Sequence, residues 1–107
     1  MKQNKFDKAM QLMQTDYSLL TEYSNMFIMM DKKQEAAWEK AQIAQYMQMP
    51  DGFLDFEIQR RKKLTNEEKS NEALHWMIFG SRVDAKELAV AYMDWAHIPY
   101  DLSRLNK

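Results

Sequence analysis

The N-terminal part of the chain carries two apolar stripes with helical spacing. The first recurs at alternating steps of four and three residues: Phe6, Met10, Met13, Tyr17, Leu20, Ser24 and Phe27. The second keeps the same heptad phase on another side: Leu12, Leu19, Tyr23, Met26 and Met30. At about 100° per residue the two stripes lie roughly 120° apart. The pattern predicts one long helix with two apolar faces, and such a helix needs two different neighbours.

Helix-terminating residues are rare and divide the chain into segments. Before Pro50 the sequence contains no other proline and no glycine, and good helix formers such as Ala, Gln, Glu, Lys, Met and Leu dominate there. We predict a first helix over residues 4–30. A second is predicted over 31–49, opening on the capping-box residues Asp31 and Gln34 and ending before the proline.

The segment after the Pro-Asp-Gly turn is ambiguous between helix and strand. Leu54, Phe56 and Ile58 alternate with polar residues, as in a half-buried strand. A single strand without a partner cannot make a sheet, however, unless another chain supplies one. We therefore predict a short helix over 53–63, with a strand over 53–59 as the alternative that would change the fold class to α+β.

Two further helices are predicted in the C-terminal half. Thr65 and Glu68 form a second capping box, and the helix that it opens ends at Gly80. One face of this helix, taken as the side toward the core, contains Leu74, Met77 and Ile78. Asp84 and Glu87 repeat the capping signal. The helix that follows ends before the second proline and has one apolar side, made of Leu88, Ala91, Tyr92 and Trp95.

These elements predict an all-α fold. We expect a single domain over residues 1–107, in which four or five helices pack as a compact bundle around the long N-terminal helix. A hydrophobic content of 46% is enough to build a core. Apolar runs such as residues 26–30 are far short of the roughly 20 residues that span a membrane. Without an export signal or any cysteine, the sequence predicts a soluble, cytoplasmic protein.

Catalytic motifs are not apparent. Ser81 lies outside a Gly-x-Ser-x-Gly elbow, and the sequence has no glycine-rich phosphate loop, calcium loop or His-Glu-x-x-His motif. Glu72/His75 and Asp94/His97 have the carboxylate-x-x-histidine spacing of di-iron bundles, but both histidines project away from the predicted core faces. We therefore expect no enzyme activity, no cofactor, no metal and no small-molecule substrate.

The two faces of the first helix suggest a role in association. Later helices can cover one face, and the other is most simply covered by a second copy or by a different protein. We predict a protein-interaction module, acting as a regulator, adaptor or inhibitor through a helical surface and forming a homodimer. The predicted partner-binding residues belong to the second stripe: Leu12, Leu19, Tyr23, Met26 and Met30. Richness in Lys, Asn and Gln points to a bacterial or phage genome.

The alternative is a small DNA-binding regulator of transcription or replication. The net charge of −1 gives no overall attraction to nucleic acid, so such binding would be local. It would use a basic run and two further arginines: Arg60, Arg61, Lys62, Lys63, Arg82 and Arg104.

A weak motif resemblance accompanies this alternative. Lys86-Glu87-Leu88-Ala89 followed by Leu102-Ser103-Arg104-Leu105 resembles the outer parts of a helix-turn-helix. The middle differs, because Met93 stands where the sharp turn usually has glycine and Trp95 takes a position that is usually small. A further turn of helix is expected in the tail, through Leu102 and Leu105.

Overall fold

The structure is a computed structural model that describes residues 4–99. Within that range the chain forms helices and no strand: α1 (Lys5–Tyr23), α2 (Lys32–Met47), α3 (Asp51–Lys62), α4 (Asn66–Phe79) and α5 (Ala85–Trp95). The predicted all-α fold with a long N-terminal helix is confirmed. The expected helical turn through Leu102 and Leu105 lies outside the described residues.

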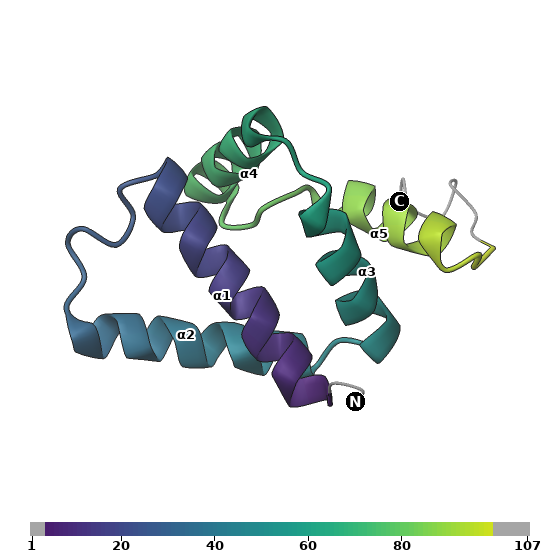
Figure 1. Ribbon diagram of the computed structural model, residues 1–107, viewed down its shortest axis with the longest axis horizontal. Coiled ribbons are helices and arrows are strands. Elements are labelled where there is room, and N and C mark those ends of the chain that lie inside the picture. Colours follow the sequence, from purple (N-terminus) through teal and green to yellow (C-terminus); the bar gives the residue numbers. More distant parts are fainter. Residues whose placement is uncertain (1–3, 100–107) are drawn as a thin grey trace.

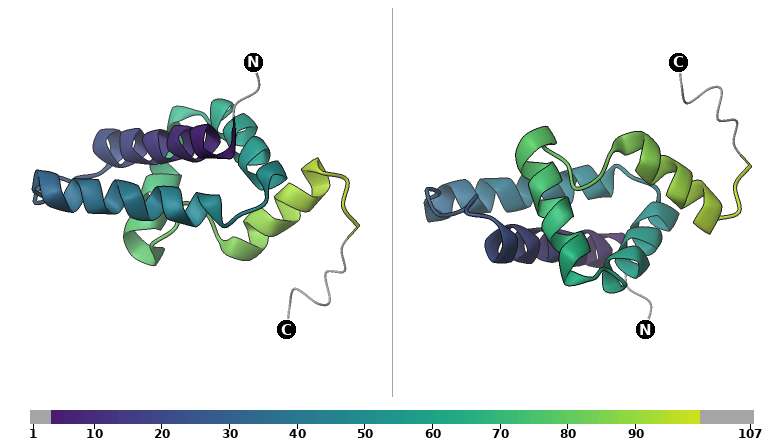
Figure 2. Two further views of the ribbon diagram at one scale, coloured as in Figure 1. Left: turned by 90° about the horizontal axis from the view of Figure 1, so that it is seen from below. Right: turned by 90° about the horizontal axis from the view of Figure 1, so that it is seen from above.

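The first helix is the centre of the arrangement. α1 lies across α2 and also packs against α3 and α4, whereas α5 contacts α3 at the edge of the molecule (Figure 1). Figure 2 shows α1 and α2 as neighbouring layers, with α5 leading away toward the C-terminus. Three other helices therefore pack against α1, which explains how residues from both of its apolar stripes can be buried within one chain.

The core contains residues from both predicted stripes. Leu12 and Leu19 from the second stripe are buried, as are Met13 and Leu20 from the first. One buried cluster joins α1, α2 and α3 and consists of Ala9, Leu12, Tyr46, Leu54 and Ile58. Burying one leucine or isoleucine side chain of this cluster stabilises the fold by about 1.5–3 kcal/mol.

The strand alternative for residues 53–59 is wrong, because they belong to α3. Leu54 and Ile58, four residues apart, lie on the helix side that joins the α1–α2 core. Phe56 points to another side, where its ring lies 5.7 Å from that of Tyr92 in α5. A helix with apolar residues on two sides thus produces the alternation that resembles a strand.

The first helix is shorter than predicted. It ends at Tyr23 and not at Met30, because Ser24 adopts an extended backbone and its hydroxyl donates a 2.6 Å hydrogen bond to the Leu20 carbonyl. The chain then turns back, and the ring of Phe27 lies 4.9 Å from that of Trp38 in α2. The stripe residues after position 23 therefore pack from a loop. α2 also ends earlier than predicted, at position 47 in place of 49.

The predicted capping signals are confirmed as helix starts. Asp31 and Gln34 form the reciprocal capping box of α2, and Thr65 and Glu68 form that of α4. The Asp84 carboxylate accepts hydrogen bonds from the backbone amides of Lys86 and Glu87 in the first turn of α5. None of the helices within residues 4–99 is both long enough and apolar enough to cross a lipid bilayer.

The core face predicted for α4 is wrong. Leu74, Met77 and Ile78 are exposed, whereas α4 buries Glu72 and Ala73. Trp76 makes the aromatic contact of α4 with α2, and its ring centroid lies 6.3 Å from that of Trp38. The helix therefore turns a mixed, partly charged side toward α1 and leaves its most apolar side outside.

Gly80 ends α4 in the left-handed conformation, with φ of 76°. An added Cβ would meet no atom within 4 Å, so only the backbone conformation opposes a side chain. We expect Gly80→Ala to lower the free energy of unfolding by about 1 kcal/mol in urea denaturation. Ser70→Ala, on the exposed side of the same helix, is the control and should be neutral or slightly stabilising. An equal effect of the two substitutions would contradict this reading.

Candidate functional site: a buried ionic network between two cavities

Six charged side chains from four parts of the chain meet beneath α1. They come from α1, α3, α4 and the loop between α4 and α5: Asp16, Glu57, Arg60, Arg61, Glu72 and Arg82. The Asp16 side chain is 0% exposed and that of Glu57 is 2% exposed. The three carboxylates and three guanidinium groups balance in formal charge. Such burial is tolerated only when each charge is paired and hydrogen-bonded.

Arg61 has the most partners in this network. Its Nε donates to Glu57 Oε2 at 2.9 Å, and its Nη1 lies 3.0 Å from Asp16 Oδ1. Nη1 also donates to the Leu12 carbonyl and to the Thr15 hydroxyl of α1. Arg61 thereby fixes α3 against α1 through backbone as well as side-chain groups.

Tyr46 extends the network to α2. Its hydroxyl donates to Asp16 Oδ2 and accepts a 2.8 Å hydrogen bond from Arg61 Nη2. Burial and the nearby Asp16 carboxylate raise the pKa of Tyr46 far above its usual value, so the phenol remains protonated. It therefore serves as a donor to Asp16 at any ordinary pH.

Glu72 connects the other two arginines. Its Oε2 accepts from Arg60 Nη1 at 2.7 Å, and its Oε1 accepts from Arg82 Nε at 3.0 Å. Arg82 Nη1 then reaches Asp16 Oδ1 at 3.0 Å. Arg82 thus joins the α4–α5 loop to α1.

The pKa values of Glu57 and Arg82 are both lowered, for different reasons. Burial raises the pKa of Glu57, but hydrogen bonds and charges from Arg60 and Arg61 outweigh it and hold that pKa below 4.5. Burial lowers the pKa of Arg82, and the neighbouring positive charge of Arg61 lowers it further. The carboxylate is therefore well compensated, whereas Arg82 is incompletely compensated by its anionic partners.

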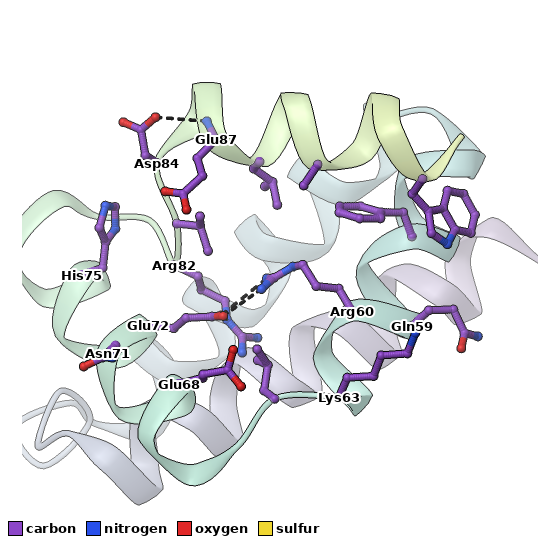
Figure 3. Close-up of a pocket in the computed structure, with 16 residues that line it drawn as sticks. Gln59, Arg60, Lys63, Glu68, Asn71, Glu72, His75, Arg82, Asp84 and Glu87 are labelled. Carbon is purple, nitrogen blue, oxygen red and sulfur yellow. Dashed lines mark hydrogen bonds and ion pairs between the residues drawn. The ribbon is translucent and has the colours of Figure 1, made fainter. Parts of the chain in front are cut away.

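A cavity of 590 Å³ borders the network on the side of α3, α4 and α5. Figure 3 shows Arg60 and Glu72 pointing toward one another from opposite walls, with Glu87 projecting from α5. Its charged and ionisable lining is mixed and contains Arg60, Lys63, Glu68, Glu72, His75, Arg82, Asp84 and Glu87. The four acidic residues of this lining outnumber its three lysine and arginine residues, so the wall offers no excess positive charge to an anion.

A second cavity, of 350 Å³, borders the network on the side of α1. Its walls come from α1, α3, α4 and the loop that contains Arg82. The lining combines apolar side chains with Arg61, Lys62, Lys69 and Arg82, and its acidic member is Glu22. Among the charged residues that the structure describes, this wall is therefore predominantly cationic.

The two side chains of the Glu72/His75 pair form hydrogen bonds with other groups of the chain. Glu72 is committed to two arginines, and the His75 Nδ1–H group donates to the Ser81 carbonyl. Over residues 4–99, no three His, Cys, Asp or Glu side chains converge as a metal site would require. His97 follows α5 with a left-handed backbone, at φ of 58°.

The predicted partner-binding residues are not brought together on an open surface. Leu12 and Leu19 are buried in the chain's own core, whereas Tyr23, Met26 and Met30 are half-buried. The Tyr23 hydroxyl donates to Asn66 of α4 at 3.1 Å. Leu12, Leu19 and Tyr23 also line the smaller cavity. Leu12 and Leu19 are therefore not available to a partner at the outer surface of α1.

The predicted nucleic-acid contacts are also divided. Arg60, Arg61 and Arg82 are paired with buried carboxylates, Lys62 and Lys63 remain exposed, and Arg104 lies outside the described residues. α5 continues without interruption through Met93, so the resemblance to a helix-turn-helix has no sharp turn at that point. Three of the six residues proposed to bind phosphates therefore hold the fold together.

Comparisons with protein-family models, with curated proteins and with solved structures found no match for this chain.

Proposed function

We propose that the chain is a protein-interaction module that forms a homodimer through the exposed apolar face of α4. The observation behind the proposal is the exposure of four large side chains within six residues. Leu74 and Met77 are each 56% exposed, Ile78 is 62% exposed and Phe79 is 70% exposed. Contiguous apolar surface of this kind is typical of association sites.

We propose that a second copy of the chain covers this apolar face of α4. The apolar residues lie along a single helix, so an antiparallel pairing of two α4 helices about a twofold axis would place the same residues opposite one another. The stretch from Leu74 to Phe79 contains no acidic or permanently cationic side chain that such a pairing would bury. A formal charge of −1 per chain also means that two copies repel each other only weakly.

As a function, we propose a regulator, adaptor or inhibitor that acts by presenting a helical surface. The cytoplasm is the proposed location and a bacterium or phage the proposed source, as expected from the sequence. The dimer would be the active form, because a twofold arrangement presents each remaining surface twice.

The homodimer is tested by molar mass in solution. At micromolar concentrations, light scattering should give twice the chain mass of 12.8 kDa for the wild type. Leu74→Glu combined with Ile78→Glu should shift this mass to that of a single chain, because burying these charges in the interface costs several kcal/mol. Both side chains are already exposed, so helix content in circular dichroism should not change.

The matched control is Ile28→Glu in the α1–α2 loop. Ile28 is 72% exposed and lies outside α4, so this variant receives the same change of chemistry and should remain dimeric. A wild-type mass of 12.8 kDa at every concentration would overturn the homodimer. Equal dissociation of the control would show that the α4 face is not the interface.

A further inference from the structure

The smaller cavity, on the α1 side of the ionic network, has the composition of a binding site for an amphipathic anion. Its volume of 350 Å³ falls within the range of small-molecule pockets, about 300–1,000 Å³. One part of the wall is apolar and contains Leu12, Leu19, Ile58 and Leu64. The other part contains cationic groups from α3, α4 and the α4–α5 loop.

Arg82, which lines this cavity as well as the larger one, has unused hydrogen-bond donors. Its Nε donates to Glu72 and its Nη1 donates to Asp16, but Nη2 has no partner among the described residues. No fully buried side-chain nitrogen or oxygen of those residues lacks a partner, so Nη2 must reach accessible space. Arg82 as a whole is only 7% exposed, and it lines the cavities on either side of the network.

The surrounding charges select the α1 side. The larger cavity adds Glu68, Asp84 and Glu87 to Glu72, and these would repel an anion. In the smaller cavity, the rim adds Lys62 and Lys69 against Glu22 alone. Since the buried network is balanced in itself, this rim leaves a net positive charge over an arginine with free donors.

We propose that this cavity binds an oxyanion, a carboxylate or phosphate, at the free Nη2 of Arg82, with the ligand's hydrocarbon part against the apolar wall. Lys62 and Lys69 would attract the anionic group at the rim. The lowered pKa of Arg82 agrees with this site, because a bound anion would provide the compensation that its present partners leave incomplete. The inference is independent of the homodimer, since none of these residues belongs to the exposed α4 face.

Calorimetric titration of the full chain tests the site with defined probes. Octanoate and octyl phosphate carry the oxyanion on a hydrocarbon chain, inorganic phosphate carries the oxyanion alone, and 1-octanol carries the chain without charge. We expect the two amphipathic anions to bind and 1-octanol to bind at least about tenfold more weakly, because the alcohol cannot form a charged hydrogen bond with the guanidinium group. Inorganic phosphate binding as tightly as octyl phosphate would support the oxyanion site and identify a free anion as its ligand.

Variants assign the binding to particular residues. Arg82→Lys keeps the charge but loses the guanidinium fork, and should weaken octanoate binding by at least about tenfold. Lys69→Gln changes a rim residue outside the network, so it keeps the test valid if the first variant does not fold, and should weaken binding roughly twofold to fivefold. Lys86→Gln, an exposed residue of α5, is the charge-matched control and should bind as the wild type does.

Two results would overturn the proposal. The first is no heat and no change in melting temperature with any of the anionic probes at millimolar concentration. The second is anion binding that is unchanged in Lys69→Gln and in folded Arg82→Lys, which would place the anion elsewhere.

Discussion

Replacing Asp16 with alanine should lower the free energy of unfolding by about 3–5 kcal/mol, which is the usual cost of removing one partner from a buried ion pair. Asp16 is fully buried, and one of its oxygens faces both Arg61 and Arg82 while the other accepts from Tyr46. Without it, two guanidinium groups in the interior lose a counter-ion and a buried phenol loses its acceptor. Small domains have only about 5–15 kcal/mol of stability, so the variant should be close to unfolding.

Urea denaturation followed by circular dichroism measures this effect. Glu22→Ala is the matched control, because it removes an exposed carboxylate from the same helix and should change stability by no more than about 0.5 kcal/mol. Asp16→Asn should fall between the two, since the amide oxygen can accept one of the hydrogen bonds but provides no charge. A loss below about 1 kcal/mol in Asp16→Ala would mean that the network contributes little to the fold.

Local features of the fold were predictable because their causes are local. The capping boxes at Asp31 and Thr65 and the stop at Gly80 each depend on backbone groups within a few residues. The end of α1 was missed because good helix formers and the apolar phase both continue past Tyr23. Tertiary packing determines where α1 ends, since Phe27 gains aromatic contacts with Tyr17 and Trp38 by leaving the helix.

The ionic network was less predictable, because its decisive pairs are distant in sequence. Glu57 precedes Arg60 and Arg61 by three and four residues, the spacing of ion pairs on one helix face. That signal could have indicated that the basic run is internally paired. The contact of Arg82 with Asp16 joins positions 66 residues apart and has no local signature. An aspartate between two apolar stripes was the only hint of a buried charge on α1.

The orientation of α4 relative to the core was also not predictable from the sequence. Periodicity identified Leu74, Met77 and Ile78 as one face, but it cannot say whether a face meets the core or the solvent. In this chain, Glu72 pairs with Arg60 and Arg82, and Trp76 contacts Trp38. These contacts turn the mixed, charged side of α4 toward the core and leave the apolar side facing solvent. Because buried charges occupy the inner side, the apolar side becomes available for association.

The folded chain should lose stability steeply in acid. Arg60 and Arg61 hold the pKa of Glu57 below its ordinary value of 4.5, so the folded state retains the charge more strongly than the unfolded state does. The resulting stability is complete above pH 4.5 and is lost as the pH falls through the lower folded-state pKa. The arginines remain charged throughout, so protonation of Glu57 leaves uncompensated positive charge in the interior.

Stability measured between pH 7 and pH 2 tests this mechanism, and we expect cooperative unfolding to begin below about pH 4. Glu57→Gln should be less stable than the wild type at pH 7, because it lacks the charge that Arg60 and Arg61 require. It should also show a shallower decline on acidification, because it has no carboxyl group to titrate at that position. Glu67→Gln, which alters an exposed carboxylate of α4, should follow the wild-type profile. Parallel profiles for Glu57→Gln and the wild type would assign the acid sensitivity to other carboxylates and remove Glu57 from this account.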